Sequence, residues 1–411
     1  MNRSGFIKPF CSRPFSSGQQ LYRHALLTTG SGARFADVTV ENGRIISIDG
    51  AADGRFETEI DLQGARVLPG VIDPHVHFAL PVGNRITVDD FRTGSMKAML
   101  GGTTTVFDFT TPEAGVSLFE SVRRRAVEAR DALCTVFLHG TVVGWNDRIR
   151  EQADRCLEMG IASFKFFTAY EESGRRTSYE AIELAAGWAA RRNARIIVHA
   201  EDQASLVSVD RFPSDAFKYF EMSRPVVAEV TAIQRLAEIQ KWTGAMMAIV
   251  HVSSGSGAEA AYGSGLYLET CPHYLTLTRD VYCGAIGWQF AVTPPLRSQG
   301  EQTALWDAVT DGRIHWIGSD HAPFPAADYM DAGDHFTRTP FGLDGAGTLL
   351  SRMIDSGIKT GKLSWERLAE LTSENTARFY GLFPDRGTLD VGSRWDAVSI
   401  DNDNQIRIQP I

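Results

Sequence analysis

Cysteine is scarce in this chain, and the few that occur form no pattern. The 411 residues include five cysteines, an odd number, and no two of them are spaced as C-x-x-C. This excludes a disulfide framework and a zinc site built from cysteine pairs. We therefore expect a reducing compartment, the cytoplasm.

Positive charge is also in deficit, and long apolar runs are absent from the sequence. Lys and Arg total 41 against 50 Asp and Glu, which gives a formal net charge of −9. An acidic chain has no electrostatic basis for binding nucleic acid or an anionic membrane surface. No apolar run approaches the ~20 residues that a membrane-spanning helix needs. We expect a globular protein with neither a nucleic-acid partner nor a membrane partner.

The start of the chain lacks acidic residues. Residues 1–20 combine basic residues with Ser and Phe, which is typical of transit peptides, but they lack the apolar core of a secretory signal. We expect residues 1–20 to be a disordered extension, and a targeting role stays open.

Short strands and tight turns are predicted near both ends of the chain. In residues 21–66, Asn42-Gly43 separates two alternating apolar runs, which predicts a β-hairpin. Residues 385–411 return to the same texture. The simplest topology joins residues 21–66 and 385–411 in one small, β-sandwich-like domain.

Between residues 67 and 384, apolar runs rich in β-formers alternate with helical stretches. Eight β/α units over about 250 to 300 residues predict a (β/α)8 barrel of the TIM type. The eight runs are Val67–Phe78, Thr103–Phe109, Leu133–His139, Ala162–Phe167, Arg195–Ala200, Met246–Val252, Leu266–Tyr274 and Ile314–Ser319.

Several of these runs carry residues that bind metal ions, and most of these lie at a run's end. In such barrels the active site lies at the carboxyl ends of the strands. Because residues two apart on a strand project to the same face, His75 and His77 can face one cation. An H-x-H pair alone is a weak signal, but the whole set predicts a metal centre. The set is His75, His77, Lys165, His199, His251 and Asp320.

Lys165 is the unusual member of this set. An ammonium group beside cation ligands would repel the metal and would cost desolvation energy. Carbon dioxide can convert a neutral lysine amine into a carbamate, an anionic group whose two oxygens can bridge two metal ions. The alternative is that Lys165 simply ends a strand and extends its amine to water.

Eight short segments together carry a family resemblance over about residues 36 to 400. They are Pro69–His77, Ile86–Phe91, Gly101–Thr104, Ser163–Tyr170, Val198–Glu201, Glu269–Pro272, Pro294–Arg297 and Gly318–His321. With these segments the chain resembles the cyclic-amidohydrolase branch of the amidohydrolase superfamily, and within it hydantoinases and dihydropyrimidinases most.

The resemblance implies a binuclear centre of two divalent metal ions, most simply Zn²⁺. It implies that His75 and His77 bind one ion and that His199 and His251 bind the other. It further implies that Lys165 carries an N6-carboxyl group bridging both ions, and that Asp320 contacts the first. The same N/O ligands accept manganese or cobalt, so the sequence leaves the metal's identity open.

The resemblance also implies a mechanism. A metal-bound hydroxide attacks a carbonyl of a cyclic amide. Asp320 takes the proton and passes it to the departing ring nitrogen, while the hydroxyl of Tyr170 stabilises the oxyanion.

One residue difference from related enzymes narrows the class of substrate. Enzymes that resemble dihydroorotases have an arginine two residues after the second histidine of H-x-H, where this chain has Ala79. A methyl group cannot pair with a substrate carboxylate, so we expect a neutral ring. Phe78 and Phe167 suggest an apolar wall for a ring substituent, although core packing explains them equally well. The main-chain groups that hold the cyclic imide in hydantoinases align with Thr293 and Phe341.

Two departures qualify the resemblance. The stretch Phe341–Gly347 lacks an expected glutamate, which predicts a reshaped loop after the eighth run. The sequence also stops soon after the small β domain, whereas hydantoinases carry a longer tail that helps to join subunits. We still expect a homo-oligomer, either a dimer or a tetramer.

The sequence thus predicts a hydrolase that opens neutral five- or six-membered cyclic ureides or imides of the hydantoin or dihydropyrimidine type. The product would be an N-carbamoyl amino acid. Three alternatives stay open: an allantoinase- or dihydroorotase-like cyclic amidohydrolase, a mononuclear deaminase, and a non-catalytic dihydropyrimidinase-related scaffold.

Overall fold

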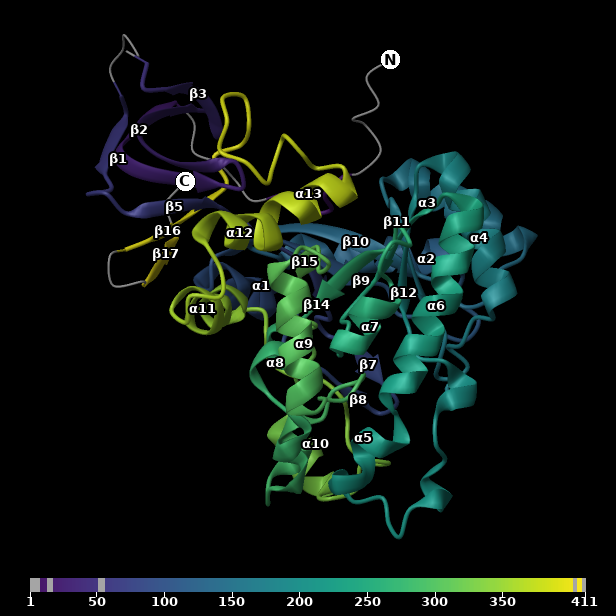
Figure 1. Cartoon of the computed structure of the whole chain (residues 1–411). Coiled ribbons are helices and arrows are strands. Elements are labelled where there is room, and N and C mark those ends of the chain that lie inside the picture. The colour runs from purple at the N-terminus through teal and green to yellow at the C-terminus, as the bar shows by residue number, and fades with distance from the viewer. Residues whose placement is uncertain (1–7, 13–17, 51–55, 402–404, 409–411) are drawn as a thin grey trace.

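The computed structural model describes residues 8–12, 18–50, 56–401 and 405–408 (Figure 1). The predicted N-terminal extension falls partly outside these ranges. Of its described part, Phe10 donates its N–H to the carbonyl of Val136 over 2.8 Å, and the Val136 N–H donates to the Cys11 carbonyl over 3.0 Å. This short segment therefore lies against a strand of the larger sheet.

Eight parallel strands form the larger sheet, each hydrogen-bonded to the next in chain order. They are β6 (Val71–Val76), β9 (Thr103–Phe109), β10 (Thr135–Thr141), β11 (Ser163–Phe167), β12 (Arg195–His199), β13 (Met246–Ile249), β14 (Tyr267–Thr270) and β15 (Trp316–Ile317). The barrel closes through an isolated parallel bridge between Val76 of the first strand and His321, which follows the last strand. The chain thus forms the (β/α)8 barrel that the sequence predicted.

The barrel is filled and covered by apolar side chains. All residues of β6, β9, β10 and β12 are buried, as expected for parallel strands that lie between helices and the barrel interior. Rings of Phe107, Phe137, Trp316 and Tyr380 pack together inside the barrel.

The helices pack around this sheet (Figure 1). Serine side chains cap two of the helices: Ser178 accepts a hydrogen bond from the Ala181 N–H, and Ser364 accepts one from the Arg367 N–H. The helices are α1 (Phe91–Leu100), α2 (Leu118–Glu128), α3 (Asp147–Met159), α4 (Tyr179–Arg192), α5 (Phe220–Ser223), α6 (Val226–Thr243), α7 (Gly255–Ala260), α8 (Pro272–Thr276), α9 (Gln299–Thr310), α10 (Ala326–Ala332), α11 (Leu349–Met353), α12 (Trp365–Ala369) and α13 (Asn375–Tyr380).

A second sheet combines strands from both ends of the chain and lies beside α12 and α13 (Figure 1). It has the order β17-β16-β5-β1-β2-β3, and β4 pairs with β1. Asn42 and Gly43 form the predicted hairpin turn with φ of 50° and 73°. The strands are β1 (Gln19–Thr29), β2 (Gly32–Glu41), β3 (Arg44–Ile48), β4 (Thr58–Asp61), β5 (Arg66–Pro69), β16 (Ala397–Ile400) and β17 (Ile406–Ile408).

Most of the predicted runs differ from the observed strands by a few residues at their ends, and two of them change element within the run. The first run divides at Pro69 and Gly70, so that β5 joins the second sheet and β6 joins the barrel. Only a glycine fits at position 70, because a Cβ there would overlap the Thr104 side chain. The seventh run ends as a strand at Thr270, since Pro272 starts helix α8.

Among the described residues, no helix combines the length and the apolar character that crossing a bilayer requires.

Candidate metal centre

The carboxyl ends of five barrel strands bring the predicted metal ligands together. Tyr170, His251 and Asp320 follow β11, β13 and β15 and have φ of 69°, 42° and 50°. Non-glycine residues seldom adopt positive φ, and such conformations cluster at functional sites. The backbone is therefore shaped to aim these side chains at the barrel mouth.

His75, His77 and Asp320 form the first group of ligands. Oδ1 of Asp320 lies 3.2 Å from Nε2 of His75 and 3.3 Å from Nε2 of His77. One ligand atom from each of the three residues lies within 4.8 Å of the other two, close enough for one ion to bind all three. Burial raises the pKa of Asp320, but the imidazoles of His75 and His77 outweigh it, and the pKa lies well below its usual value.

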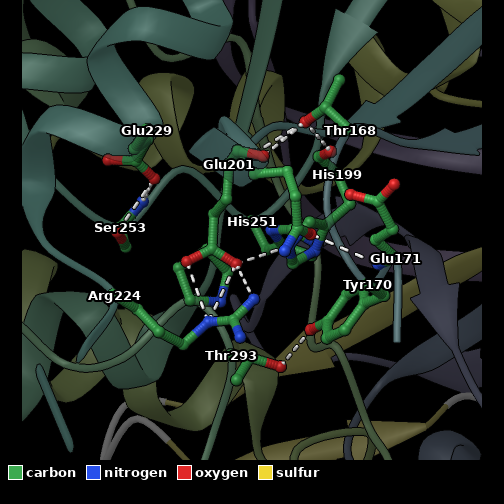
Figure 2. Close-up of polar contacts among 12 residues, drawn as sticks. Thr168, Tyr170, Glu171, His199, Glu201, Arg224, Glu229, His251, Ser253 and Thr293 are labelled. Atoms are coloured by element: carbon green, nitrogen blue, oxygen red, sulfur yellow. Dashed lines mark hydrogen bonds and ion pairs between the residues drawn. The ribbon is translucent and has the colours of Figure 1, made fainter. Parts of the chain in front are cut away.

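His199 and His251 form the second group. Nδ1 of His199 and Nε2 of His251 lie 3.0 Å apart, and both rings are buried (Figure 2). The His251 ring also lies 5.3 Å from the His75 ring, measured between centroids. The two groups are therefore neighbours in one site.

Lys165 lies near both groups, next to two phenylalanine rings that contact them. Its Nζ is 5.3 Å from the centre of the Phe109 ring, which contacts His75 and His77, and 5.1 Å from that of Phe167. The Phe167 ring in turn lies 5.7 Å from the His199 ring. This is the place that a bridging ligand would need.

The Lys165 amine is in an environment that disfavours its charge. The side chain is buried and forms no ion pair with a carboxylate of the described residues. Burial lowers its pKa well below the usual range of lysine. The neutral amine, the form that reacts with carbon dioxide, is thus more populated near neutral pH than in a lysine exposed to water.

Two buried carboxylates accept hydrogen bonds from the ring nitrogens of His75 and His199 that do not face the other predicted ligands. Glu269 accepts a hydrogen bond from Nδ1 of His75 over 2.7 Å, and Glu201 accepts one from Nε2 of His199 over 2.7 Å. Such partners fix the ring and leave the other nitrogen free for a metal ion. Sequence reasoning assigned no role to either glutamate. Its spacing could have identified Glu201, because it lies only two residues after the predicted ligand His199.

The residues present therefore fit a metal centre. The facing atoms are imidazole nitrogens and carboxylate oxygens, a donor set that suits Zn²⁺ and other divalent ions. His75, His77 and Asp320 would hold one ion and His199 and His251 a second.

The predicted substrate-binding residues are placed differently from one another. The hydroxyl of Tyr170 lies 2.6 Å from Oγ1 of Thr293 (Figure 2). The centroid of the Phe167 ring lies 5.8 Å from that of the Tyr170 ring. The Phe341 ring stacks on Phe220 with centroids 5.0 Å apart. Tyr170 and Phe167 lie beside His199, with ring centroids 4.9 and 5.7 Å from its ring, and Thr293 contacts Tyr170.

Phe78 is a core residue. Its ring is fully buried, packs 5.7 Å from Phe91 and 5.6 Å from His321, and closes against Gly94 of α1. Core packing, the alternative for this residue, accounts for its position, so we do not assign it to the substrate wall.

His321, directly after Asp320, is held by charged groups. It lies 3.2 Å from carboxylate oxygens of both Asp89 and Asp344, and Lys97 pairs with the same two carboxylates. Asp344 belongs to the stretch in which a glutamate was expected. The Asp344 carboxylate thus ties this loop to the end of the barrel.

Comparison with known proteins places this geometry in context. The model of the amidohydrolase family matches residues 66–410. D-phenylhydantoinase of Escherichia coli O1:K1 / APEC is 32% identical over 404 residues, which cover 95% of this chain and 87% of that protein.

Solved structures of hydantoinases and dihydropyrimidinases are also similar to this chain. Dihydropyrimidinase from Brevibacillus agri NCHU1002 superposes with a TM-score of 0.87 at 30% identity, covering 93% of this chain and 86% of that one. L-hydantoinase (dihydropyrimidinase) from Arthrobacter aurescens superposes with a TM-score of 0.85 at 28% identity, with the same coverage. Relatives named for opposite enantiomers are thus similar to this chain to nearly the same degree.

Proposed function

Because the chain belongs to the amidohydrolase family and is a hydantoinase- and dihydropyrimidinase-like hydrolase of C–N bonds, we propose that it opens neutral five- or six-membered cyclic ureides and imides. Hydantoins and dihydropyrimidines are the substrate class, and N-carbamoyl amino acids are the products.

The observation that carries this proposal is the arrangement of two ligand groups around one buried lysine. His75, His77 and Asp320 converge on one point, while His199 and His251 converge on a neighbouring one. We propose two zinc ions at these points, with a carboxylated Lys165 between them. When bound, such ions supply a hydroxide nucleophile near neutral pH and polarise a carbonyl oxygen.

The chain's own residues manage the protons and the developing charge. Asp320, ionised because of the surrounding imidazoles, accepts the proton of the nucleophile and delivers it to the ring nitrogen that leaves. The Tyr170 hydroxyl donates to the oxygen that becomes negative during attack. Thr293, whose side chain touches that hydroxyl, offers its main chain to the ring of the substrate.

The alanine at position 79 favours a neutral substrate. Ala79, where an anion-binding arginine would stand, has φ of 43° and donates its N–H to the Asp89 carbonyl over 2.6 Å. Phe167 supplies an apolar surface next to Tyr170. We further propose a homo-oligomer, a dimer or a tetramer, located in the cytoplasm.

Steady-state assays of the zinc-loaded protein test the substrate class. Hydantoin, 5-phenylhydantoin, dihydrouracil, allantoin and dihydroorotate are compared by kcat/KM. We expect the neutral hydantoins or dihydrouracil to exceed dihydroorotate by at least ~10², because the site lacks the group that would pair with the carboxylate. A preference for dihydroorotate contradicts the proposal.

The Ala79→Arg variant provides the matched comparison. It should narrow the gap between dihydroorotate and hydantoin without a gain for hydantoin. A folded protein that binds no divalent ion and hydrolyses none of these compounds would instead indicate a scaffold.

A further inference from the structure

Arg224, which lies between α5 and α6, forms a buried bidentate pair with Glu201. Its Nε lies 3.0 Å from Oε1 and its Nη2 lies 2.5 Å from Oε2 of that carboxylate (Figure 2). The Glu201 side chain is fully buried, and that of Arg224 is 13% exposed. Oε2 of Glu201 is also the atom that accepts from His199. One carboxylate thus joins the arginine to a candidate metal ligand.

The same guanidinium contacts a second part of the site. Its central carbon lies 5.0 Å from the centre of the Tyr170 ring, within the range of a cation–π contact. The Tyr170 ring lies 4.9 Å from the His199 ring. Arg224 therefore contacts both the tyrosine and the carboxylate that contact His199.

The Glu201 carboxylate depends on Arg224 for its position. The arginine donates to both carboxylate oxygens, and one of these oxygens also accepts from His199. Without the arginine, a buried carboxylate would lose its bidentate partner and the contacts that fix its orientation toward His199.

A second buried arginine fixes the backbone of Arg224. Arg297 donates from Nη1 to the Arg224 carbonyl over 2.5 Å and from Nε to Oγ of Ser253 over 2.9 Å. Ser253 in turn donates its hydroxyl and its N–H to Glu229, each over 2.8 Å. Arg224 thus starts from a rigid base.

We propose that Arg224 is a positioning residue that fixes two parts of the site against each other. Through Glu201 it orients His199, and through the Tyr170 ring it orients the hydroxyl that faces the substrate. This inference rests on the proposed function for the role of Tyr170, whereas the role toward His199 requires only that the site bind metal.

The chain contains a matched control one residue further on. Asp202 follows Glu201, and Arg235 lies with its Nη1 3.9 Å from Oδ1 of Asp202 and its guanidinium 4.8 Å from the Tyr179 ring. This is again an arginine, a carboxylate and a tyrosine, but the Arg235 side chain is 55% exposed. Arg235→Lys therefore makes the same chemical change without touching the candidate centre.

The experiment compares Arg224→Lys with Arg235→Lys in the full-length, zinc-loaded protein. Lysine keeps the charge but loses the bidentate geometry and the flat contact with the ring. We expect Arg224→Lys to release one zinc ion to a chromogenic chelator about 10 to 100 times faster than the wild type, and to lower kcat by a similar factor. KM should change much less than kcat, and Arg235→Lys should match the wild type in all three quantities.

Each outcome of this comparison is informative. Zinc release and kcat that are equal in Arg224→Lys and Arg235→Lys overturn the inference. If Arg224→Lys does not fold, the double variant Arg224→Met, Glu201→Gln replaces the ion pair by groups that carry no charge, and the same release and kcat are expected. If the wild type binds zinc but hydrolyses no cyclic ureide, faster zinc release from Arg224→Lys or from the double variant upholds the role toward His199 and refutes the proposed function. A wild type that binds no zinc overturns both.

Discussion

The Glu269 carboxylate accepts a hydrogen bond from Nδ1 of His75 over 2.7 Å, and this sets which nitrogen of the ring faces Asp320. Glu269 also accepts from the Trp316 indole over 2.9 Å, so the carboxylate itself is fixed. The ring of His75 is thus oriented before any ion arrives.

Replacing this carboxylate should weaken metal binding. We expect Glu269→Gln to lower zinc affinity or kcat by about 10 to 100 times, because an amide accepts less strongly from His75 and can point its NH₂ group at the ring. Competition with a chelator and steady-state assays measure the two quantities. Glu128→Gln, on the surface of α2, is the control, and equal affinities in the two variants would contradict the role of Glu269.

Lys165 should be indispensable for the second ion. Its amine is buried near both ligand groups, so Lys165→Ala removes the only proposed bridge. We expect a loss of activity larger than the ~10 to 100 times typical of a residue that only supports a ligand. Elemental analysis should find fewer ions per chain.

A small carboxylic acid provides the complementary test at this position. Added acetate can enter the space left in Lys165→Ala and supply two oxygens, and part of the activity should return. Lys359→Ala, an exposed lysine paired with Asp355, should change neither quantity. Full activity in Lys165→Ala without any additive would refute the carbamate.

Tyr170 and its neighbour Thr293 should differ in their effects. Tyr170→Phe removes the donor to the developing oxyanion, and we expect kcat to fall by about 10² to 10³. Thr293→Val removes the side-chain oxygen 2.6 Å from the tyrosine hydroxyl but keeps the main chain. Its kcat should fall much less, and equal losses in both variants would assign the key contact to the threonine side chain.

His273 should make the fold sensitive to acid. Burial lowers its pKa to about 4, whereas a histidine in the unfolded chain has a pKa of about 6.5. Between these values the unfolded state binds a proton that the folded state does not, so stability falls as the pH drops from about 6.5 to about 4. The gap corresponds to on the order of 3 kcal/mol of free energy of unfolding.

The His273→Gln variant isolates this contribution. Urea unfolding at pH 7 and at pH 4.5 gives the stability lost by each protein. We expect the variant to lose less than the wild type over this interval. Identical losses would show that His273 stays neutral in both states or is charged in both.

Local patterns in the sequence predicted most of the barrel and its ligand groups. β9 spans the residues predicted for the second run, because Thr, Val and Phe, which make up most of it, favour strands. His75 and His77 share a face because the period of a strand is two residues. The family resemblance then linked the other ligand positions to these two.

Contacts between distant segments could not be read in this way. Arg224 lies 23 residues after Glu201, on a loop with no periodic pattern, and nothing in its neighbourhood predicts the pair. Phe78 shows the opposite difficulty: a phenylalanine at a strand end is consistent with a pocket wall or with core packing, and only the position of Gly94 decides between them.

The joint that closes the barrel lies beside the ligands. The bridge joins Val76 of β6 to His321, which follows β15. Val76 lies between His75 and His77 in the chain, and His321 directly follows Asp320. An ion bound by all three residues would therefore link the first strand of the barrel to the segment that follows the last one. After the ion is removed, hydrogen–deuterium exchange should increase first at the backbone amides near Val76 and His321, and only later in the surrounding helices.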